Sequence, residues 1–232
     1  MTSKTKQASQ QFMSIVIGGK SLQCLIRIKS VKYIYFRLTH DKVLTVTLPK
    51  RLSPNIESII QSRSNWILRQ ISKVEKCKKV VTENQVYYLG KLHSLEIKVI
   101  EKESPHVCLY DGKFVFYLKK PKDLNKMMDT FLKQETMIYV NKIIPGLIQQ
   151  LDLSPNELVY RKMKKWGCCT SKGKIVLNSY LICLPIELIG YIVCHELIHL
   201  LHFDHSSQFH KALVNFLPDA KRLEKDLKLY CK

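Results

Sequence analysis

The sequence predicts an α+β protein, in which an antiparallel β-rich N-terminal part is followed by a helical part. Two patterns along the chain support this prediction. Between residues 14 and 118, short apolar runs rich in β-branched and aromatic residues alternate with turn residues, as in strands. Further on, apolar residues recur at the spacing of a helix instead. We therefore expect a flexible tail at 1–11, a basic β-rich part at 12–120 and a helical part at 121–232.

Two groups of strands are predicted in the N-terminal part, with a helix between them. A stripe of isoleucines predicts a helix from Ser53-Pro54, which supply an N-cap and a first helical position, to about Lys76. Asp111-Gly112 is typical of a hairpin turn. No internal repeat is evident. The expected strands are 14–18, 22–28, 32–38 and 43–49, which should form an antiparallel meander, and then 85–90, 92–100, 106–110 and 113–118.

The helical part is predicted to contain a long helix, a short hairpin and a second helix. Apolar residues at helical spacing predict that the long helix begins at Lys122 and reaches Pro145 or beyond. The hairpin pairs LVYRKMKKW with KIVLN and turns at Ser171-Lys172-Gly173. Pro185 then stands where helices commonly begin, and the helix after it carries the motif described below.

The formal net charge of +19 is concentrated in the N-terminal part of the chain. Residues 1–82 hold 16 Lys and Arg against 3 Asp and Glu, whereas residues 83–232 hold 22 against 16. Such a field favours phosphate-bearing partners, including nucleic acids. A lysine-rich surface that contacts only solvent would give the same count, so charge alone names no partner.

The composition favours a cytoplasmic protein. No apolar run reaches the roughly 18 residues of a membrane span, and the first residues, MTSKTKQASQQ, contain no hydrophobic signal core. The eight cysteines include no CxxC pair and lie among apolar residues, which favours reduced thiols over a disulfide framework. We therefore expect a protein that is neither secreted nor inserted in a membrane. The oligomeric state is not predicted by these patterns.

Residues 195–205 read HELIHLLHFDH and combine four histidines and a glutamate with apolar residues. His195 and His199 are four positions apart, so on a helix both rings stand on one face, about 6 Å apart along the axis, and can share one zinc ion. Glu196 is offset by about 100° of helical rotation, which lets its carboxylate reach water at the metal without binding the metal itself. We expect Glu196 to act as general base and acid in a hydrolysis.

The third ligand is either His202 or His205. His202 would lie about 10.5 Å along the axis from His195 if the helix continued, too far to share one ion. His205 becomes available if the chain turns back after His202, and its spacing matches the pattern HExxHxxGxxH. That pattern has glycine where this chain has His202, although histidine tolerates a left-handed backbone better than most residues. We favour His205. Three neighbouring cysteines are expected to pack in the core rather than to bind zinc: Cys168, Cys169 and Cys194.

These motifs resemble those of the YgjP-like family of metal-dependent hydrolases, relatives of the SprT-like proteases in the zincin superfamily. The resemblance covers about residues 14–230 and rests on KMKKWGCCTSKGKIVLNSYLI (162–182), PIELIGYIVCHELIHLLHFDHSSQF (185–209) and Pro218-Asp219. The family pattern resembles RWGSC, then G-x-I-x-L-N, HELxH and H-S-x-x-F. The resemblance implies that 12–120 and 121–232 form one family unit, with a zincin-like catalytic part. It also implies zinc ligands and a catalytic carboxylate at these positions: His195, His199, His205 and Glu196.

The substrate is left open by these residues. The resemblance implies a metallopeptidase, which we favour, and the family is also associated with nucleoside triphosphate pyrophosphatase activity on UTP. Lys164, Lys165 and Trp166 are the expected substrate contacts, and strand alternation would place Lys162, Lys164 and Trp166 on one face. Clustered cations beside a metal suit a triphosphate, whereas an extended peptide needs none. A third alternative is a basic nucleic-acid-binding or adaptor protein with structural zinc, against which the intact Glu196 argues.

Overall fold

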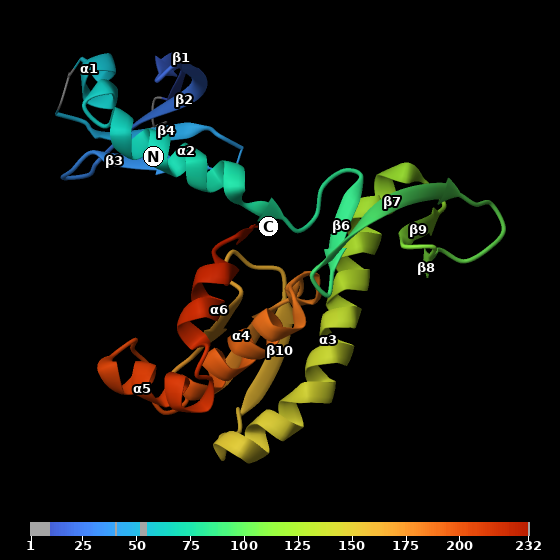
Figure 1. The fold of residues 1–232 in the computed structure, drawn as a ribbon. Coiled ribbons are helices and arrows are strands. Elements are labelled where there is room, and N and C mark those ends of the chain that lie inside the picture. The colour runs from blue at the N-terminus through green and yellow to red at the C-terminus, as the bar shows by residue number, and fades with distance from the viewer. Residues whose placement is uncertain (1–9, 40, 52–54, 232) are drawn as a thin grey trace, which may run out of the picture. The chain divides into compact units, whose positions relative to one another are not determined.

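The computed structural model describes residues 10–39, 41–51 and 55–231. The chain divides into two compact units, Met1–Cys77 and Lys78–Lys232, called here unit 1 and unit 2 (Figure 1). Strands precede helices in the chain as a whole, which confirms the predicted α+β class. The expected division after residue 120 falls inside unit 2.

Unit 1 consists of a four-stranded sheet with two helices packed on one face. The strand order is β1-β2-β4-β3 and β2 runs parallel to β4, so the expected antiparallel meander is wrong at this step. The two strands richest in buried residues thereby lie at the centre of the sheet, and the shorter β3 takes an edge. The elements are β1 (Gln10–Ile17), β2 (Lys20–Lys29), β3 (Tyr35–Leu38), β4 (Leu44–Pro49), α1 (Ile56–Gln61) and α2 (Ser64–Lys76).

Two predicted features of unit 1, the N-terminal tail and the start of the helix, fall largely outside the described residues. The expected flexible tail, 1–11, lies outside the described residues except for Gln10 and Gln11, which already belong to β1. Ser53-Pro54 also lie outside them, and α1 as described begins after Asn55, whose side chain caps its first turn. The single helix expected here is two helices. The Ser62 hydroxyl donates to a backbone carbonyl of the preceding turn at 2.8 Å, which competes with helical pairing between them.

Unit 2 begins with a second four-stranded sheet that repeats the topology of the first. Its order is β6-β7-β9-β8, and β7 runs parallel to β9 just as β2 runs parallel to β4. The first hairpin of each sheet turns at glycines with positive φ, Gly18 and Gly19 in unit 1 and Gly90 in unit 2. The sequence shows no repeat because little more than these turns is shared. The strands are β6 (Gln85–Tyr88), β7 (Lys91–Val99), β8 (His106–Tyr110) and β9 (Lys113–Leu118). The short β5 (Lys78–Lys79), which precedes them in the chain, pairs in parallel with β13 (Tyr230–Cys231) near the other end of unit 2.

The predicted long helix is confirmed as α3, Leu124–Leu151, which continues past Pro145. It packs against α4 and the short helix before it, as Figure 1 shows for α3 and α4. No helix in the described part of the chain has the length and apolar character that a membrane span requires. The remaining elements are η1 (Pro121–Asp123), β10 (Glu157–Arg161), β11 (Gly167–Cys169), β12 (Lys174–Asn178), η2 (Leu181–Cys183), α4 (Ile186–Ile198), α5 (Ser207–Phe216) and α6 (Ala220–Leu227).

The predicted hairpin before the motif helix is only partly correct. β11 pairs antiparallel with β12 across the expected turn at Gly173, but β10 runs parallel to β12 on its other side. The segment 162–166 is therefore a loop that crosses from one edge of this sheet to the other. The expectation that Lys162, Lys164 and Trp166 share one face of a strand is wrong, because backbone groups of this loop bond to a buried side chain instead of a neighbouring strand.

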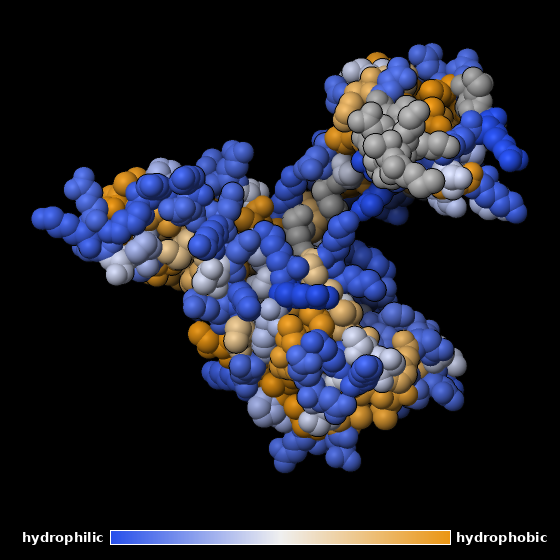
Figure 2. Space-filling model, turned by 180° about the vertical axis from the view of Figure 1, so that it is seen from behind, coloured by the Kyte–Doolittle hydropathy of each residue, from blue (hydrophilic) through white to orange (hydrophobic). Residues whose placement is uncertain are grey.

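The face of the protein drawn in Figure 2 is mainly hydrophilic. Figure 2 shows blue side chains over most of the visible face, with hydrophobic patches in orange between them. The interior of each unit has its own apolar cluster, and that of unit 2 includes most of α4. The helix that carries the motif is therefore built into the core of unit 2.

A buried threonine ties α3 to the segment that leads into α4. The Thr136 hydroxyl donates to the carbonyl oxygen of Ser179 at 3.0 Å and accepts from the amide of Ile182 at 3.2 Å. Its side chain is fully buried, so neither of these backbone groups has water as a substitute partner.

Replacing Thr136 with Val keeps the shape of the side chain and removes both hydrogen bonds. We expect the free energy of unfolding of unit 2 to fall by about 1–3 kcal/mol, because two buried backbone groups lose their partner. Urea denaturation followed by the fluorescence of Trp166, in a Trp66→Phe background, measures this. Thr130→Val on the same helix is the control, since Thr130 is exposed and bonds only to Lys126 within the helix. Equal losses in the two variants would contradict the role given to Thr136.

Candidate metal centre and active site

The helix α4 is buried over most of its length, and its last turn carries the polar residues. His195 and Glu196 lie in that turn, and His199 is the C-cap residue. The chain then leaves the helix and turns back through His202 to His205, which directly precedes the N-cap of α5. The turn requires no left-handed residue at His202, so the absence of glycine there has no structural cost.

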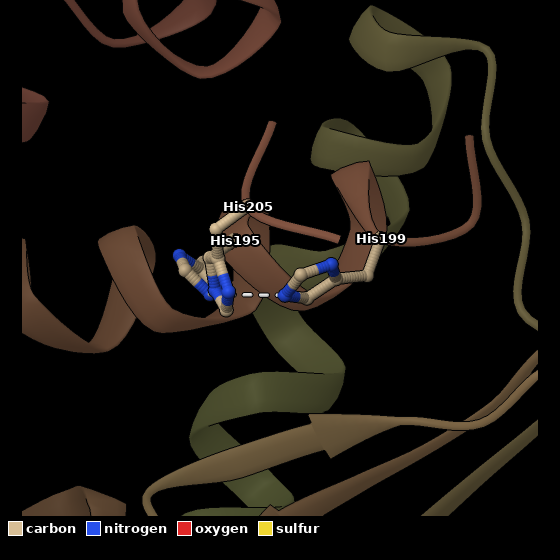
Figure 3. A group of neighbouring side chains, drawn as sticks. All are labelled: His195, His199 and His205. Atoms are coloured by element: carbon tan, nitrogen blue, oxygen red, sulfur yellow. Dashed lines mark hydrogen bonds between the residues drawn. The ribbon is translucent and has the colours of Figure 1, made fainter. Parts of the chain in front are cut away.

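The three histidine rings converge. The Nε2 atom of His195 lies 3.1 Å from that of His199 and 3.1 Å from that of His205. Figure 3 shows the three rings turned toward one another. In the described residues this is the one group of His, Cys, Asp or Glu side chains whose ligand atoms come close enough to hold a metal ion.

These distances fit a tetrahedral zinc site. Nitrogen ligands at 2.0–2.1 Å from zinc are separated from one another by about 3.3 Å in a tetrahedral arrangement. The Nδ1 atom of His199 donates to the carbonyl oxygen of His202 at 2.9 Å, which leaves the lone pair of Nε2 free for a metal. His202 thus contributes its backbone to the site, whereas its ring is not part of the group.

His195 and His199 are held in their neutral form, which is the form that binds metals. Burial, followed by the neighbouring rings of His199 and His205, lowers the pKa of His195 to about 4. Burial also lowers the pKa of His199, against the opposing effect of its hydrogen bond to His202. Two neutral imidazoles with their Nε2 atoms together need no proton release before a cation binds.

The ring of Phe209 packs against the rings of all three histidines. It is fully buried, and its ring centroid lies 4.5 Å from that of His199, 4.8 Å from His195 and 5.0 Å from His205. Ser206 accepts a hydrogen bond from the Phe209 amide and so caps α5 immediately after His205. The segment His205–Phe209 therefore positions a ligand, a cap and a packing ring together.

Glu196 lies against β11, where only a glycine leaves room for it. A Cβ atom placed on Gly167 would lie 2.5 Å from Oε1 of Glu196 and 2.7 Å from its Cγ. Burial raises the pKa of Glu196 to about 7, with Lys165 acting in the opposite direction. Its buried Oε2 has no hydrogen-bond partner among the described residues. The carboxyl group is therefore available for proton transfer. Sequence reasoning gave Gly167 no role, although its place in the Trp-Gly pair was visible.

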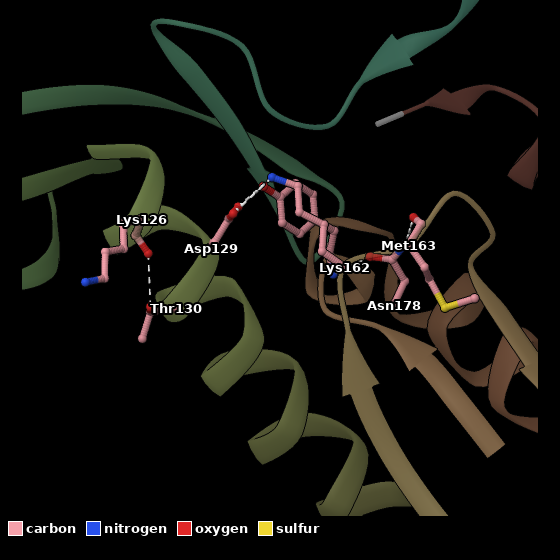
Figure 4. Close-up of polar contacts among 7 residues, drawn as sticks. Lys126, Asp129, Thr130, Lys162, Met163 and Asn178 are labelled. Atoms are coloured by element: carbon pink, nitrogen blue, oxygen red, sulfur yellow. Dashed lines mark hydrogen bonds and ion pairs between the residues drawn. The ribbon is translucent and has the colours of Figure 1, made fainter. Parts of the chain in front are cut away.

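The loop before β11 is held by the side chain of Asn178. The amide Nδ2 of this fully buried residue donates to the carbonyl oxygen of Met163 at 2.6 Å (Figure 4) and to that of Lys165 at 2.8 Å. Its backbone amide donates to Trp166, and its Oδ1 accepts from the next turn of the chain. The loop that leads into Gly167 is thereby fixed in place. The motif G-x-I-x-L-N indicated this residue without indicating its partners.

A cavity of about 580 Å³ extends from the histidines and Glu196. Lys165 and Trp166 line it, as does Gly167, whereas Lys164 is not among the lining residues. Lys162 points to α3, where its ammonium group lies 2.8 Å from Asp129 (Figure 4). The wall away from the histidines is mainly apolar and is formed by residues of α4, α5 and α6: Tyr191, Ile192, Leu213, Val214, Ala220 and Leu227, with Lys221 and Glu224 among them.

Cys169 is the thiol most closely associated with Glu196. It lies two residues beyond Gly167 in β11, half-buried, and its thiol is directed at the carbonyl of Thr170. Burial raises its pKa, and electrostatic interactions with Glu196 and Cys168 raise it further. Cys194, the neighbour of His195, is buried and its pKa is raised to about 12 by burial. Both sulfurs are therefore protonated thiols rather than thiolate ligands.

Comparison with protein families gives one match. The family model described as YgjP-like, metallopeptidase domain, matches residues 32–230. This range includes the three histidines, Glu196 and the loop 162–166, whereas β1 and β2 precede it. No curated protein matches the chain.

The geometry predicts which histidines hold the metal. His205→Ala should reduce bound zinc to well below one equivalent per chain, because it removes one of three converging nitrogens. His202→Ala should retain the metal, because only the backbone carbonyl of that residue is used. The zinc content of both variants after dialysis, measured by inductively coupled plasma mass spectrometry, shows whether His205 or His202 is the third ligand. Loss of zinc from the His202 variant with retention in the His205 variant would refute the assignment.

The contact between Gly167 and Glu196 gives a second prediction. Gly167→Ala should displace the Glu196 side chain, and we expect hydrolytic activity to fall about 10²-fold or more while zinc content stays unchanged. Gly190→Ala is the matched control, since Gly190 lies on α4 with open space around its Cα. Activity equal to that of the control at equal zinc content would show that this glycine does not position Glu196.

Proposed function

This chain belongs to the YgjP-like metallopeptidase family, and on that premise we propose that it is a zinc-dependent peptidase acting on extended peptide segments. The observation that carries the proposal is the position of β11. This strand lies at one edge of its sheet, directly beside α4 and Glu196. It can therefore present a peptide backbone to the catalytic carboxylate.

The register of β11 determines which backbone groups face a substrate. The amide of Asn178 donates to Trp166, and the amide of Thr170 donates to Lys174, so these residues form hydrogen-bonded pairs across the two strands. Residues between such pairs direct their N–H and C=O groups to the other side. Gly167 and Cys169 therefore direct theirs to the free edge of β11, where no other described strand pairs. A peptide bound there needs no charged contacts.

The residues divide the chemistry among them. His195, His199 and His205 would hold the zinc ion, which when bound polarises a carbonyl group and makes water a stronger nucleophile. Glu196 accepts the proton of the attacking water and gives it to the leaving amine. A carboxyl group whose pKa lies near 7 can do both at neutral pH. The apolar wall of the cavity would take a hydrophobic side chain of the peptide.

Hydrolysis of a nucleoside triphosphate is the second candidate. Lys165 and Lys221 both line the cavity, and cations there would stabilise a triphosphate. Fewer lysines face the cavity than the sequence suggested, because Lys162 forms an ion pair with Asp129 instead. The mainly apolar character of the far wall favours the peptidase. An adaptor protein with a structural zinc would have no need of a carboxylate aimed at the site.

The test measures both reactions with the zinc-loaded enzyme. We expect Glu196→Gln to retain zinc and to lose about 10²–10⁴ in the rate of cleavage of an unfolded protein, because no group remains to transfer the proton. Lys165→Gln should change this rate less than about tenfold, since a peptide backbone needs no cation. Lys164→Gln, at the neighbouring position outside the cavity, is the matched control.

The outcomes separate the candidates. Release of pyrophosphate from UTP that depends on both Glu196 and Lys165, without peptide cleavage, would replace the peptidase with the nucleotide hydrolase. If neither activity depends on Glu196 at full zinc occupancy, the enzyme assignment itself is wrong.

A further inference from the structure

One face of the sheet in unit 1 is covered by α1 and α2, and the opposite face, called here the open face, has no described element of unit 1 packed on it. Strand alternation assigns the side chains to the two faces, and the apolar cluster of unit 1 confirms which residues point to the helices. The open face is formed by Phe12, Ser14 and Val16 of β1, Gln23, Leu25 and Arg27 of β2, Tyr35 and Arg37 of β3, and Thr45 and Thr47 of β4.

Two aromatic side chains are exposed on this face. Phe12 is 65% exposed and Tyr35 is 54% exposed, whereas Phe36, the neighbour of Tyr35, points to the helices and contacts Trp66. They come from the two edge strands. With strands about 4.8 Å apart, three strand spacings put them roughly 15 Å from one another. That distance matches a few nucleotides of an extended single strand better than one small ligand.

Cations and hydroxyl groups lie between and beside the aromatic rings. The register aligns Phe12 with Leu25, Thr45 and Arg37 in one row across the sheet. The next row contains Arg27, Thr47 and Tyr35. Each row therefore combines an aromatic ring, a threonine and a guanidinium group.

Unit 1 carries an excess of positive charge, and none of its acidic residues is among the residues of the open face. Residues 1–77 contain 14 Lys and Arg against 3 Asp and Glu. Of these acids, Glu57 and Glu75 belong to the helices, Glu75 pairing with Lys20 and Lys42, and Asp41 lies in a turn. Neither Arg27 nor Arg37 forms an ion pair with a described residue, and the buried Nε of Arg27 has no hydrogen-bond partner there. The open face is thus free of carboxylates.

We propose that the open face of unit 1 binds single-stranded nucleic acid. Bases can stack on Phe12 and Tyr35, phosphates can pair with Arg27 and Arg37, and the threonine hydroxyls can bond to sugars or bases. A duplex keeps its bases stacked on one another and would leave both aromatic rings unused. A lipid surface fits less well, since the rings stand on strands among hydroxyl groups instead of on a protruding apolar edge. This proposal concerns unit 1 alone and does not depend on the peptidase activity of unit 2.

The test uses the full chain and a fluorescein-labelled oligouridine of about 12 nucleotides, a length within the site sizes of sheet-based single-strand binders. Binding is measured by fluorescence anisotropy. We expect the double variant Phe12→Ala/Tyr35→Ala to lower affinity by at least about 30-fold, because two bases lose their stacking partners. The matched control is Tyr110→Ala/Phe203→Ala, which removes two exposed aromatic rings of unit 2, outside the open face.

The charges are tested in the same way. Arg37→Ala should lower affinity and reduce the slope of log K against log salt by about 0.7, as expected for one lost phosphate contact. Lys73→Ala removes the same charge from α2, on the covered side of the sheet, and should have a smaller effect on both quantities. All six substituted positions are exposed, so circular dichroism should show unchanged folding.

Three results would overturn the proposal. One is equal binding of the oligonucleotide by the Phe12/Tyr35 variant and its control. Another is an equal effect of Arg37→Ala and Lys73→Ala, because binding would then follow net charge rather than this face. The third is binding to vesicles of phosphatidylserine and phosphatidylcholine without binding to the oligonucleotide, which would identify the open face as a lipid-binding surface.

Discussion

The arrangement of the site depends on the hydrogen bonds between the buried side chain of Asn178 and the loop 162–166. Its amide bonds to two carbonyl oxygens of the loop that crosses from β10 to β11, and its backbone bonds to a third. For the carbonyls of Met163 and Lys165, the side-chain amide of Asn178 supplies the hydrogen bonds that a neighbouring strand supplies within a sheet. Because the loop is held, Gly167 comes close to Glu196. The position of the Glu196 carboxyl group is thus linked to a contact made at the end of the neighbouring strand, β12.

The burial of the motif helix explains the electrostatics of the site. α4 lies in the core of unit 2, and only its last turn reaches the cavity. Burial lowers the pKa of His195 and raises the pKa of Glu196, because in both cases the loss of water disfavours the charged form. The same buried environment therefore keeps the His195 ring neutral and gives Glu196 a pKa near neutral pH, where its carboxyl group can both accept and donate a proton. A more exposed helix would do neither.

Local patterns allowed the metal group to be predicted from the sequence, whereas strand pairing did not follow from it. The relation of His195 to His199 depends on helix geometry alone, and that of His205 on a short turn. The parallel pairing of β2 with β4, and of β7 with β9, depends on which strands share a core, and no short stretch of sequence contains that information. The loop 162–166 looked like a strand because its alternation is clear, but its hydrogen bonds go to Asn178, twelve residues beyond its end. Gly167 was missed for the same reason, since the atom that requires it belongs to another element.

Cys169 adds a consequence for the behaviour of this protein under oxidative stress. Its sulfur lies on the same side of β11 as Gly167, near a carboxylate and a metal group. Peroxide attacks thiolates far faster than thiols, and the raised pKa keeps this sulfur protonated. A sulfinate at this position would put a fixed negative charge on β11, the strand that lies against Glu196. Burial, reinforced by the neighbouring Glu196, thereby protects this sulfur from oxidation.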